Sequence, residues 1–152
     1  MRVIMLDIDG VVDSTRKRNH LDSARLARLV EVAKEGKCRV VISSHWRLIS
    51  TLHSHLKAVL RHLGVEVIGS TPTRRPWEPE RPLEILEWLQ AYNEQAAALD
   101  RPHVTHFVAI DDRDLLSERG GERLHGHFVR TDAQTGLTDT IAQQVRHPGA
   151  EL

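Results

Sequence analysis

The stretch VIMLDIDGVVD at residues 3–13, together with THFVAIDDRD at residues 105–114, decides the predicted fold. Each contains a run of four or five apolar residues that ends in two aspartates, Asp7 and Asp9 in the first and Asp111 and Asp112 in the second. Such a run is typical of a buried parallel strand, and the carboxyl ends of parallel strands open into a ligand crevice. We therefore expect two strands that lie side by side and bring four carboxylates together.

Four carboxylates in one crevice repel one another unless a cation neutralises them. The repulsion between two such charges at 4 Å is ~1 kcal/mol in water and ~4 kcal/mol at an effective dielectric constant of 20. Mg²⁺ prefers oxygen ligands, usually takes one or two carboxylates and keeps part of its water, often beside a phosphate. The sequence therefore predicts a Mg²⁺ site. The alternative for either pair taken alone is that the aspartates only cap a helix or form a turn.

Strand and helix signals alternate along the whole chain, which favours an α/β sheet covered by helices. We expect strands over residues 3–8, 38–42, 65–69, 105–110 and 127–130. We expect helices over about 22–35 and 48–63, with Leu48 on the apolar face of the second, and further helices from Pro82 and from Thr138. The polar stretch 14–20 and the proline-rich stretch 70–82 are expected to be loops. These elements predict one domain over residues 1–147 and a C-terminal tail over 148–152.

Composition excludes several classes of protein. The 152 residues can bury a sizeable core without disulfides, and 21 basic residues balance 21 acidic ones. The zero net charge gives no bulk attraction to nucleic acid, although it is compatible with a local basic patch. No apolar run approaches the ~20 residues of a membrane span, and the start of the chain lacks a signal-peptide pattern. We therefore expect a cytoplasmic protein that does not contact a membrane.

Four short motifs follow one another in a familiar order: DIDGVV at 7–12, VVISS at 40–44, ERPLEILEWL at 80–89 and FVAIDDRD at 107–114. Together they resemble the haloacid dehalogenase (HAD) superfamily. The strings SSHWR, and VRTD followed by GLT, are also similar to small bacterial HAD domains related to the phosphatase domains of nucleic-acid end-repair proteins. The resemblance implies a three-layer, Rossmann-like fold with a mostly parallel, five-stranded central sheet and helices on both faces.

The resemblance also implies a chemical role for each aspartate. Phosphoryl transfer needs a nucleophile, a proton donor for the leaving oxygen, and positive charge around the phosphoryl oxygens. Asp7 is the expected nucleophile, which forms an aspartyl phosphate, and Asp9 is the expected general acid and later base. The expected cofactor is Mg²⁺, bound by Asp7, by the backbone carbonyl of Asp9, and by Asp111 or Asp112.

The remaining expected site residues bind the phosphoryl group. Ser43 matches the hydroxyl position that follows the second strand in the family, and Ser44 is close enough to share this role or else to cap the next helix. The third motif usually supplies a lysine, but Arg81 stands there, so the cation is a planar fork instead of a point charge. Other arginines could take the same role: Arg47, Arg74 and Arg75.

The spacing of the motifs bears on the substrate. Many relatives insert a cap domain after the first motif or between the second and third, but here short loops, helices and one strand fill both intervals, so we expect no cap. By resemblance, an open crevice suits a phosphorylated macromolecule, either a nucleic-acid end or a protein side chain, and a partner subunit could close it. A phosphatase of small phosphate esters or nucleotides is the alternative. Trp77, in the proline-rich loop, is the aromatic side chain best placed to contact a substrate.

Other functions fit the motifs less well. A response-regulator receiver also gathers acids at strand ends, but the late pair Asp111 and Asp112 speaks against it. Dehalogenation is disfavoured because Asp9, the proton-transfer residue of phosphatases, is present. The alternative from another class is a non-catalytic binding module with the same fold, supported mainly by the arginine at the third motif. The sequence therefore predicts a Mg²⁺-dependent phosphohydrolase that acts through Asp7.

Overall fold

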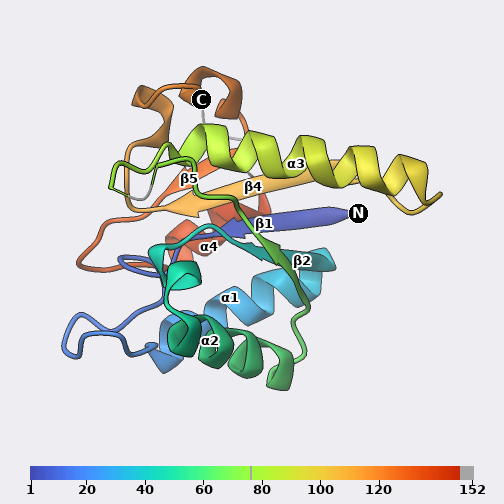
Figure 1. Ribbon diagram of the computed structural model, residues 1–152. Helices are drawn as coiled ribbons and strands as arrows, with labels where there is room; N and C mark the ends of the chain where they lie inside the picture. The colour runs from blue at the N-terminus through green and yellow to red at the C-terminus, as the bar shows by residue number, and fades with distance from the viewer. Residues whose placement is uncertain (76, 148–152) are drawn as a thin grey trace.

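Five parallel strands form the central layer of the protein (Figure 1). The computed structural model describes residues 1–75 and 77–147. In this part of the chain the strand order is β3-β2-β1-β4-β5, and every pairing is parallel. This architecture confirms the predicted α/β, Rossmann-like fold. The bounds of the strands are β1 (Arg2–Leu6), β2 (Cys38–Ile42), β3 (Val67–Ser70), β4 (His106–Asp111) and β5 (Phe128–Arg130).

Helices cover both faces of the sheet, because side chains of neighbouring residues in a strand point to opposite faces. Ile4 and Leu6 of β1 join the core beneath α1 (Ser23–Gly36), α2 (Ser50–His62) and α4 (Asp139–Arg146). Val3 and Met5 join the core beneath α3 (Arg81–Ala98), which lies across the other face (Figure 1); Leu115 and Leu124 from the segment after β4 complete this core. Three short 3₁₀ helices complete the fold: η1 (His45–Leu48), η2 (Leu115–Ser117) and η3 (Gly121–Leu124).

The ends of the helices follow from local chemistry. The side chain of Asp22 accepts a hydrogen bond from the backbone N–H of Arg25, so Asp22 caps α1. Lys37, the residue after Gly36, adopts the left-handed conformation that ends α1. Helix α3 begins at Arg81 with Pro82 in its first turn, where a missing N–H costs little.

One sequence prediction about the second helix is wrong. The apolar pattern predicted a helix from Leu48 with that side chain buried, but Leu48 is 45% exposed. The structure divides the segment into η1 and α2, and Ile49 between them is extended, with φ −112° and ψ 104°. This extended residue resets the rotation of the chain, so that Trp46, and not Leu48, enters the core.

No cap domain stands between the motifs in the described residues. Residues 7–22 form a loop that closes on itself through a bridge between Asp13 and Leu21. Residues 43–80 hold only η1, α2, β3 and the proline-rich loop, apart from residue 76, which is not described. Among the described helices, none has the length and apolar character to cross a membrane. The predicted tail at 148–152 lies outside the described residues.

Candidate active site

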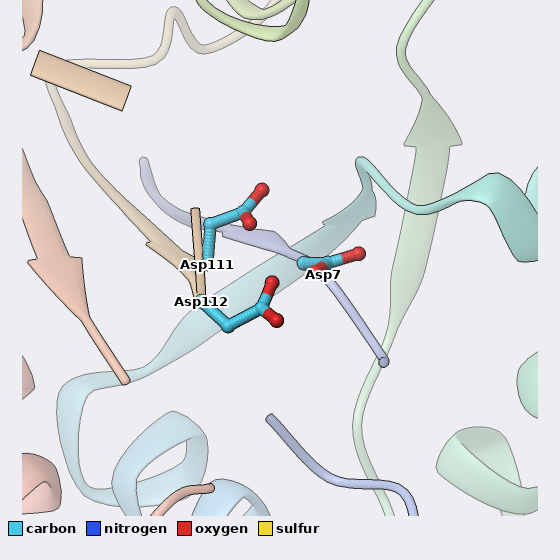
Figure 2. Close-up of side chains that lie close together, drawn as sticks. All are labelled: Asp7, Asp111 and Asp112. Carbon is cyan, nitrogen blue, oxygen red and sulfur yellow. The ribbon is translucent and has the colours of Figure 1, made fainter. Parts of the chain in front are cut away.

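The first and fourth motifs meet at the carboxyl edge of the sheet. Leu6 of β1 pairs with Ile110 of β4, and the N–H of Asp7 donates to the Ile110 carbonyl at 3.0 Å. Asp7 and Asp111 therefore lie beside each other, and both are almost completely buried. Figure 2 shows their carboxylates gathered with that of Asp112 around a common space.

The three carboxylates are close enough to share one cation. Asp7, Asp111 and Asp112 each offer an oxygen atom that lies within 4.8 Å of the other two. Gly10 makes room for this cluster: its φ is +78°, and a Cβ atom there would lie 2.5 Å from Oδ2 of Asp112. An all-oxygen donor set suits Mg²⁺, so these residues fit the expected metal. The carboxylate of Asp9 does not belong to the cluster.

Arg81 holds two of the carboxylates in place. It lies at the start of α3 and is 4% exposed. Its Nη1 donates to Oδ1 of Asp7 at 3.2 Å and to Oδ2 of Asp111 at 2.9 Å. The Nε atom of Arg81 is buried and has no hydrogen-bond partner among the described residues. Arg81, the cation expected at the third motif, therefore contacts both carboxylates through Nη1, and its Nε–H has no partner among the described residues.

The protonation of the cluster depends on burial and charge together. Burial raises the pKa of Asp7 well above its ordinary value, repulsion from Asp111 raises it further, and the charge of Arg81 opposes both. Burial also raises the pKa of Asp111, to about 6, against the opposing charge of Arg81. One arginine does not neutralise three acids, so a bound cation would favour the fully ionised site.

Asp9 has a partner that the sequence did not predict. Trp46 is 1% exposed, and its Nε1 donates to Oδ1 of Asp9 at 3.1 Å. Asp9 itself is exposed, so the indole fixes one oxygen of a carboxylate that solvent and substrate can reach. Because 37 residues separate the two, only the folded chain brings them together.

The two serines after β2 have different surroundings. The N–H of Ser43 donates to the Leu6 carbonyl at 2.8 Å, which places Ser43 next to the end of β1. Its Oγ is buried and has no hydrogen-bond partner among the described residues. The side chain of Ser44 instead accepts from the N–H of Trp46 at 3.2 Å and caps η1. Ser44 therefore has the capping role that the sequence left open.

Comparison with known proteins identifies the family to which this chain belongs. A family model described as the HAD domain in Swiss Army Knife RNA repair proteins matches residues 3–142. The chain belongs to this family. No curated protein matches it, and no solved structure does. Membership of the HAD family, together with the acidic cluster, supports a HAD-type phosphohydrolase.

In this HAD domain the other arginines near the site already have partners. Arg47 donates to the carbonyls of Ser44, Thr71 and Pro72 at 2.7, 2.9 and 3.4 Å. It also lies 3.4 Å from a carboxylate oxygen of Glu84, whose side chain is fully buried. Arg74 and Arg75 form ion pairs with nearby glutamates on an exposed surface. Arg81 is therefore the arginine that the structure brings to the acidic cluster.

Polar contacts that the sequence did not predict fix the loop of the first HAD motif. Oγ1 of Thr131 donates to the Gly10 carbonyl at 2.7 Å, and Oδ1 of Asp13 accepts from the Gly10 N–H at 2.8 Å. Buried Arg25 donates to the carbonyls of Asp13 and Gln134, at 2.8 Å each. The VRTD string carries Thr131, so its likeness to a known motif was the only signal for this contact. Trp77, the aromatic side chain expected to contact a substrate, is 82% exposed.

Proposed function

We propose that this protein is a Mg²⁺-dependent phosphatase that works through an aspartyl phosphate on Asp7. The observation that supports it best is the convergence of Asp7, Asp111 and Asp112 with Arg81 at one edge of the sheet. A nucleophilic carboxylate in such a cluster needs charge neutralisation, and that cluster suits a divalent metal. The proposal therefore accounts for the whole arrangement with one reaction.

In the first step, one carboxylate oxygen of Asp7 attacks the phosphorus atom and the bond from phosphorus to the leaving oxygen breaks. Arg81 holds Oδ1 of Asp7, which leaves Oδ2 as the attacking atom. Asp9 gives a proton to the leaving oxygen; proton transfer of this kind contributes roughly 10²–10⁴-fold in rate. Bound Mg²⁺ supplies positive charge that lowers the repulsion between Asp7 and the phosphoryl oxygens.

In the second step, Asp9 takes a proton from water, whose oxygen attacks the phosphorus atom of the aspartyl phosphate. The bond between phosphorus and Asp7 breaks, and inorganic phosphate leaves. We assign the unpartnered Oγ of Ser43 and Nε of Arg81 to the phosphoryl oxygens, because both groups are buried donors without another partner among the described residues. Arg47 donates to the Ser44 carbonyl and pairs with Glu84 in the first turn of α3, so it positions the start of α3.

For the substrate we propose a phosphorylated nucleic-acid end. The family description names RNA repair proteins, and no cap domain stands over the site in the described residues. A site without a cap leaves room for a long chain to extend away from its terminal phosphate. Small phosphate esters and nucleotides are the alternative, and for them closure of the site would need a partner subunit.

The test of the reaction is release of phosphate from p-nitrophenyl phosphate, with and without Mg²⁺. We expect activity that depends on the metal and is abolished by Asp7→Asn, which keeps the shape of the side chain and removes the nucleophile. Asp100→Asn is the matched control, because Asp100 is exposed and lies at the far end of α3. Activity that survives Asp7→Asn would refute the mechanism, and an inactive wild type would favour a non-catalytic module.

A further inference from the structure

A groove lined by residues of α2 and of the edge strand β3 lies at the outer edge of the sheet. Its volume is about 970 Å³, and both Lys57 and Val67 line it. At one end it shares these two residues with a hollow that reaches Ser70, the last residue of β3. At the other end it shares Gly64 with a hollow that reaches Lys37, just after α1. The three hollows are neighbours that share lining residues, and together we call them the edge groove.

The edge groove is basic, although the whole chain has no net charge. Among the described residues that line it, Glu66 is the only carboxylate, and Arg39 binds it at 2.6 Å. Apart from Arg39, the cationic side chains have no carboxylate partner within the described chain. The cationic side chains that line the groove are Lys34, Lys37, Arg39, Lys57 and Arg61.

Three of the basic side chains form a stripe along α2. His53, Lys57 and Arg61 are spaced four residues apart, so they lie above one another on one face of the helix. Neighbouring like charges at this spacing destabilise a helix, and the pKa of His53 is lowered by burial and by the charge of Lys57. The lowered pKa favours the neutral form of His53, so Lys57 and Arg61 are the cations of the stripe. Neither has a carboxylate partner within the described chain, which is typical of a surface that meets a polyanion.

The end of the edge groove that His53 and Ser70 line is the one nearer to the carboxyl edge of the sheet, where Asp7 lies. Nε2 of His53 lies 2.9 Å from Oγ of Ser70, which joins the top of the stripe to the end of β3. Ser70 pairs with Ile42 of β2, and Ile42 pairs with Leu6, the residue before Asp7. Two strand spacings, about 10 Å in total, therefore separate the groove from the end of β1. A short length of polynucleotide spans such a distance.

We propose that the edge groove binds the phosphodiester backbone of a single-stranded polynucleotide whose phosphorylated end lies at Asp7. The proposal rests on the phosphatase function and names the surface that holds the rest of the substrate. Lysine and arginine contacts to phosphates give affinity and register but carry no base information, so binding has little sequence preference. The outward backbone N–H groups of the edge strand β3 are additional donors for phosphate oxygens.

The test measures binding without turnover. Fluorescence anisotropy follows a short, labelled, single-stranded RNA with a terminal phosphate, in buffer that contains EDTA and no Mg²⁺. Lys57→Gln combined with Arg61→Gln removes two groove charges. The matched control, Arg101→Gln combined with Arg123→Gln, removes two exposed charges outside the groove.

Counterion release sets the expected size of the effect. Each phosphate contact of a single strand contributes about 0.7 to the slope of log K against log salt. Loss of two contacts should lower the slope by about 1.4, which corresponds to roughly 25-fold weaker binding at about 0.1 M salt. The control variant should bind RNA as the wild type does. Equal losses in both variants, or wild-type binding by the groove variant, would overturn the proposal.

Hydrolysis of p-nitrophenyl phosphate separates this proposal from the function on which it rests. That ester is too small to reach the groove, so the groove variant should hydrolyse it at the wild-type rate. If circular dichroism shows that the groove variant does not fold, a second groove variant replaces it. Lys34→Gln combined with Lys37→Gln removes two charges from the other end of the edge groove. An inactive wild type would refute the phosphatase function. The anisotropy measurements need no turnover, so they would still show whether the groove binds RNA. RNA binding that is unchanged in both groove variants would overturn the groove.

Discussion

Replacement of Trp46 by phenylalanine tests how the proposed general acid is held. Nε1 of Trp46 donates to Oδ1 of Asp9 at 3.1 Å, and the ring is buried against the core. Phenylalanine keeps a buried aromatic ring but removes the donor. A hydrogen bond to a charged group contributes about 1.5–3 kcal/mol, and each 1.36 kcal/mol is a factor of ten in rate. We therefore expect kcat/KM to fall roughly 10- to 150-fold where the leaving group needs a proton.

The choice of substrate separates this role from a general loss of stability. The p-nitrophenolate ion leaves readily without a proton, whereas the hydroxyl oxygen of a ribose needs one. The loss should therefore be large for an RNA end that carries a terminal phosphate and small for p-nitrophenyl phosphate. Trp88→Phe is the matched control, because Trp88 is half-buried on α3 and stacks on Tyr92, outside the acidic cluster.

A double-mutant cycle shows whether Trp46 acts through Asp9. In an Asp9→Asn background the carboxylate is already gone, so Trp46→Phe should cause little further loss. Equal losses with the two substrates would refute the positioning role. A loss of the same size in the Asp9→Asn background would refute it independently, because the indole would then act on something other than Asp9.

Three further predictions concern the metal cluster and its support. Burial raises the pKa of Asp111 to about 6 and that of Asp7 in the same direction, so the metal-free protein loses stability as pH rises from about 4 through about 6. Mg²⁺ binds the ionised carboxylates, and at 100 times Kd it should stabilise the folded protein by about 2.7 kcal/mol. The increase in Tm on adding Mg²⁺ should therefore be larger near pH 7.5 than near pH 5, and an equal increase at both pH values would contradict the site. Gly10→Ala should weaken Mg²⁺ binding, measured by calorimetry, because its Cβ would meet Asp112; Gly126→Ala, with the same φ of +78° and nothing within 4 Å, should leave it unchanged. Glu84→Gln leaves Arg47 buried without its carboxylate and should lower the free energy of unfolding in urea by about 3–5 kcal/mol. The exposed substitution Glu122→Gln should change that free energy by less than about 0.5 kcal/mol, and a similar loss in both variants would contradict the buried pair.

The sequence was sufficient to predict the sheet and the convergence of its acids. Apolar runs that end in aspartate specify both the strand and its open end, so Asp7 and Asp111 could be placed together from the sequence. Pro82 marked the start of α3 for a reason local to that residue, the missing N–H. Such features are predictable because each depends on a few adjacent residues.

The contacts that hold the site were not predictable in this way. Trp46 was one of three tryptophans, and no pattern indicated that its N–H would meet Asp9 from a different element. Glu84 lies in the first turn of α3, where an acid usually needs no partner because the helix dipole favours it. In the structure it is fully buried, and Arg47 from a different element lies 3.4 Å away. These pairs depend on how η1 packs against the loop after β1 and against α3, which requires the whole fold.

The arginine at the third motif shows why the departure from lysine need not abolish the reaction. It was the main sequence argument for a non-catalytic protein, since a guanidinium cannot copy the geometry of an ammonium. In the structure one nitrogen of Arg81 bridges Asp7 and Asp111, and its Nε stays free of other partners in the described chain. A lysine would have to make all of these contacts from one nitrogen, whereas the guanidinium divides them between Nη1 and Nε. The fork therefore suits a site in which one group has to order two carboxylates and still meet a phosphoryl oxygen.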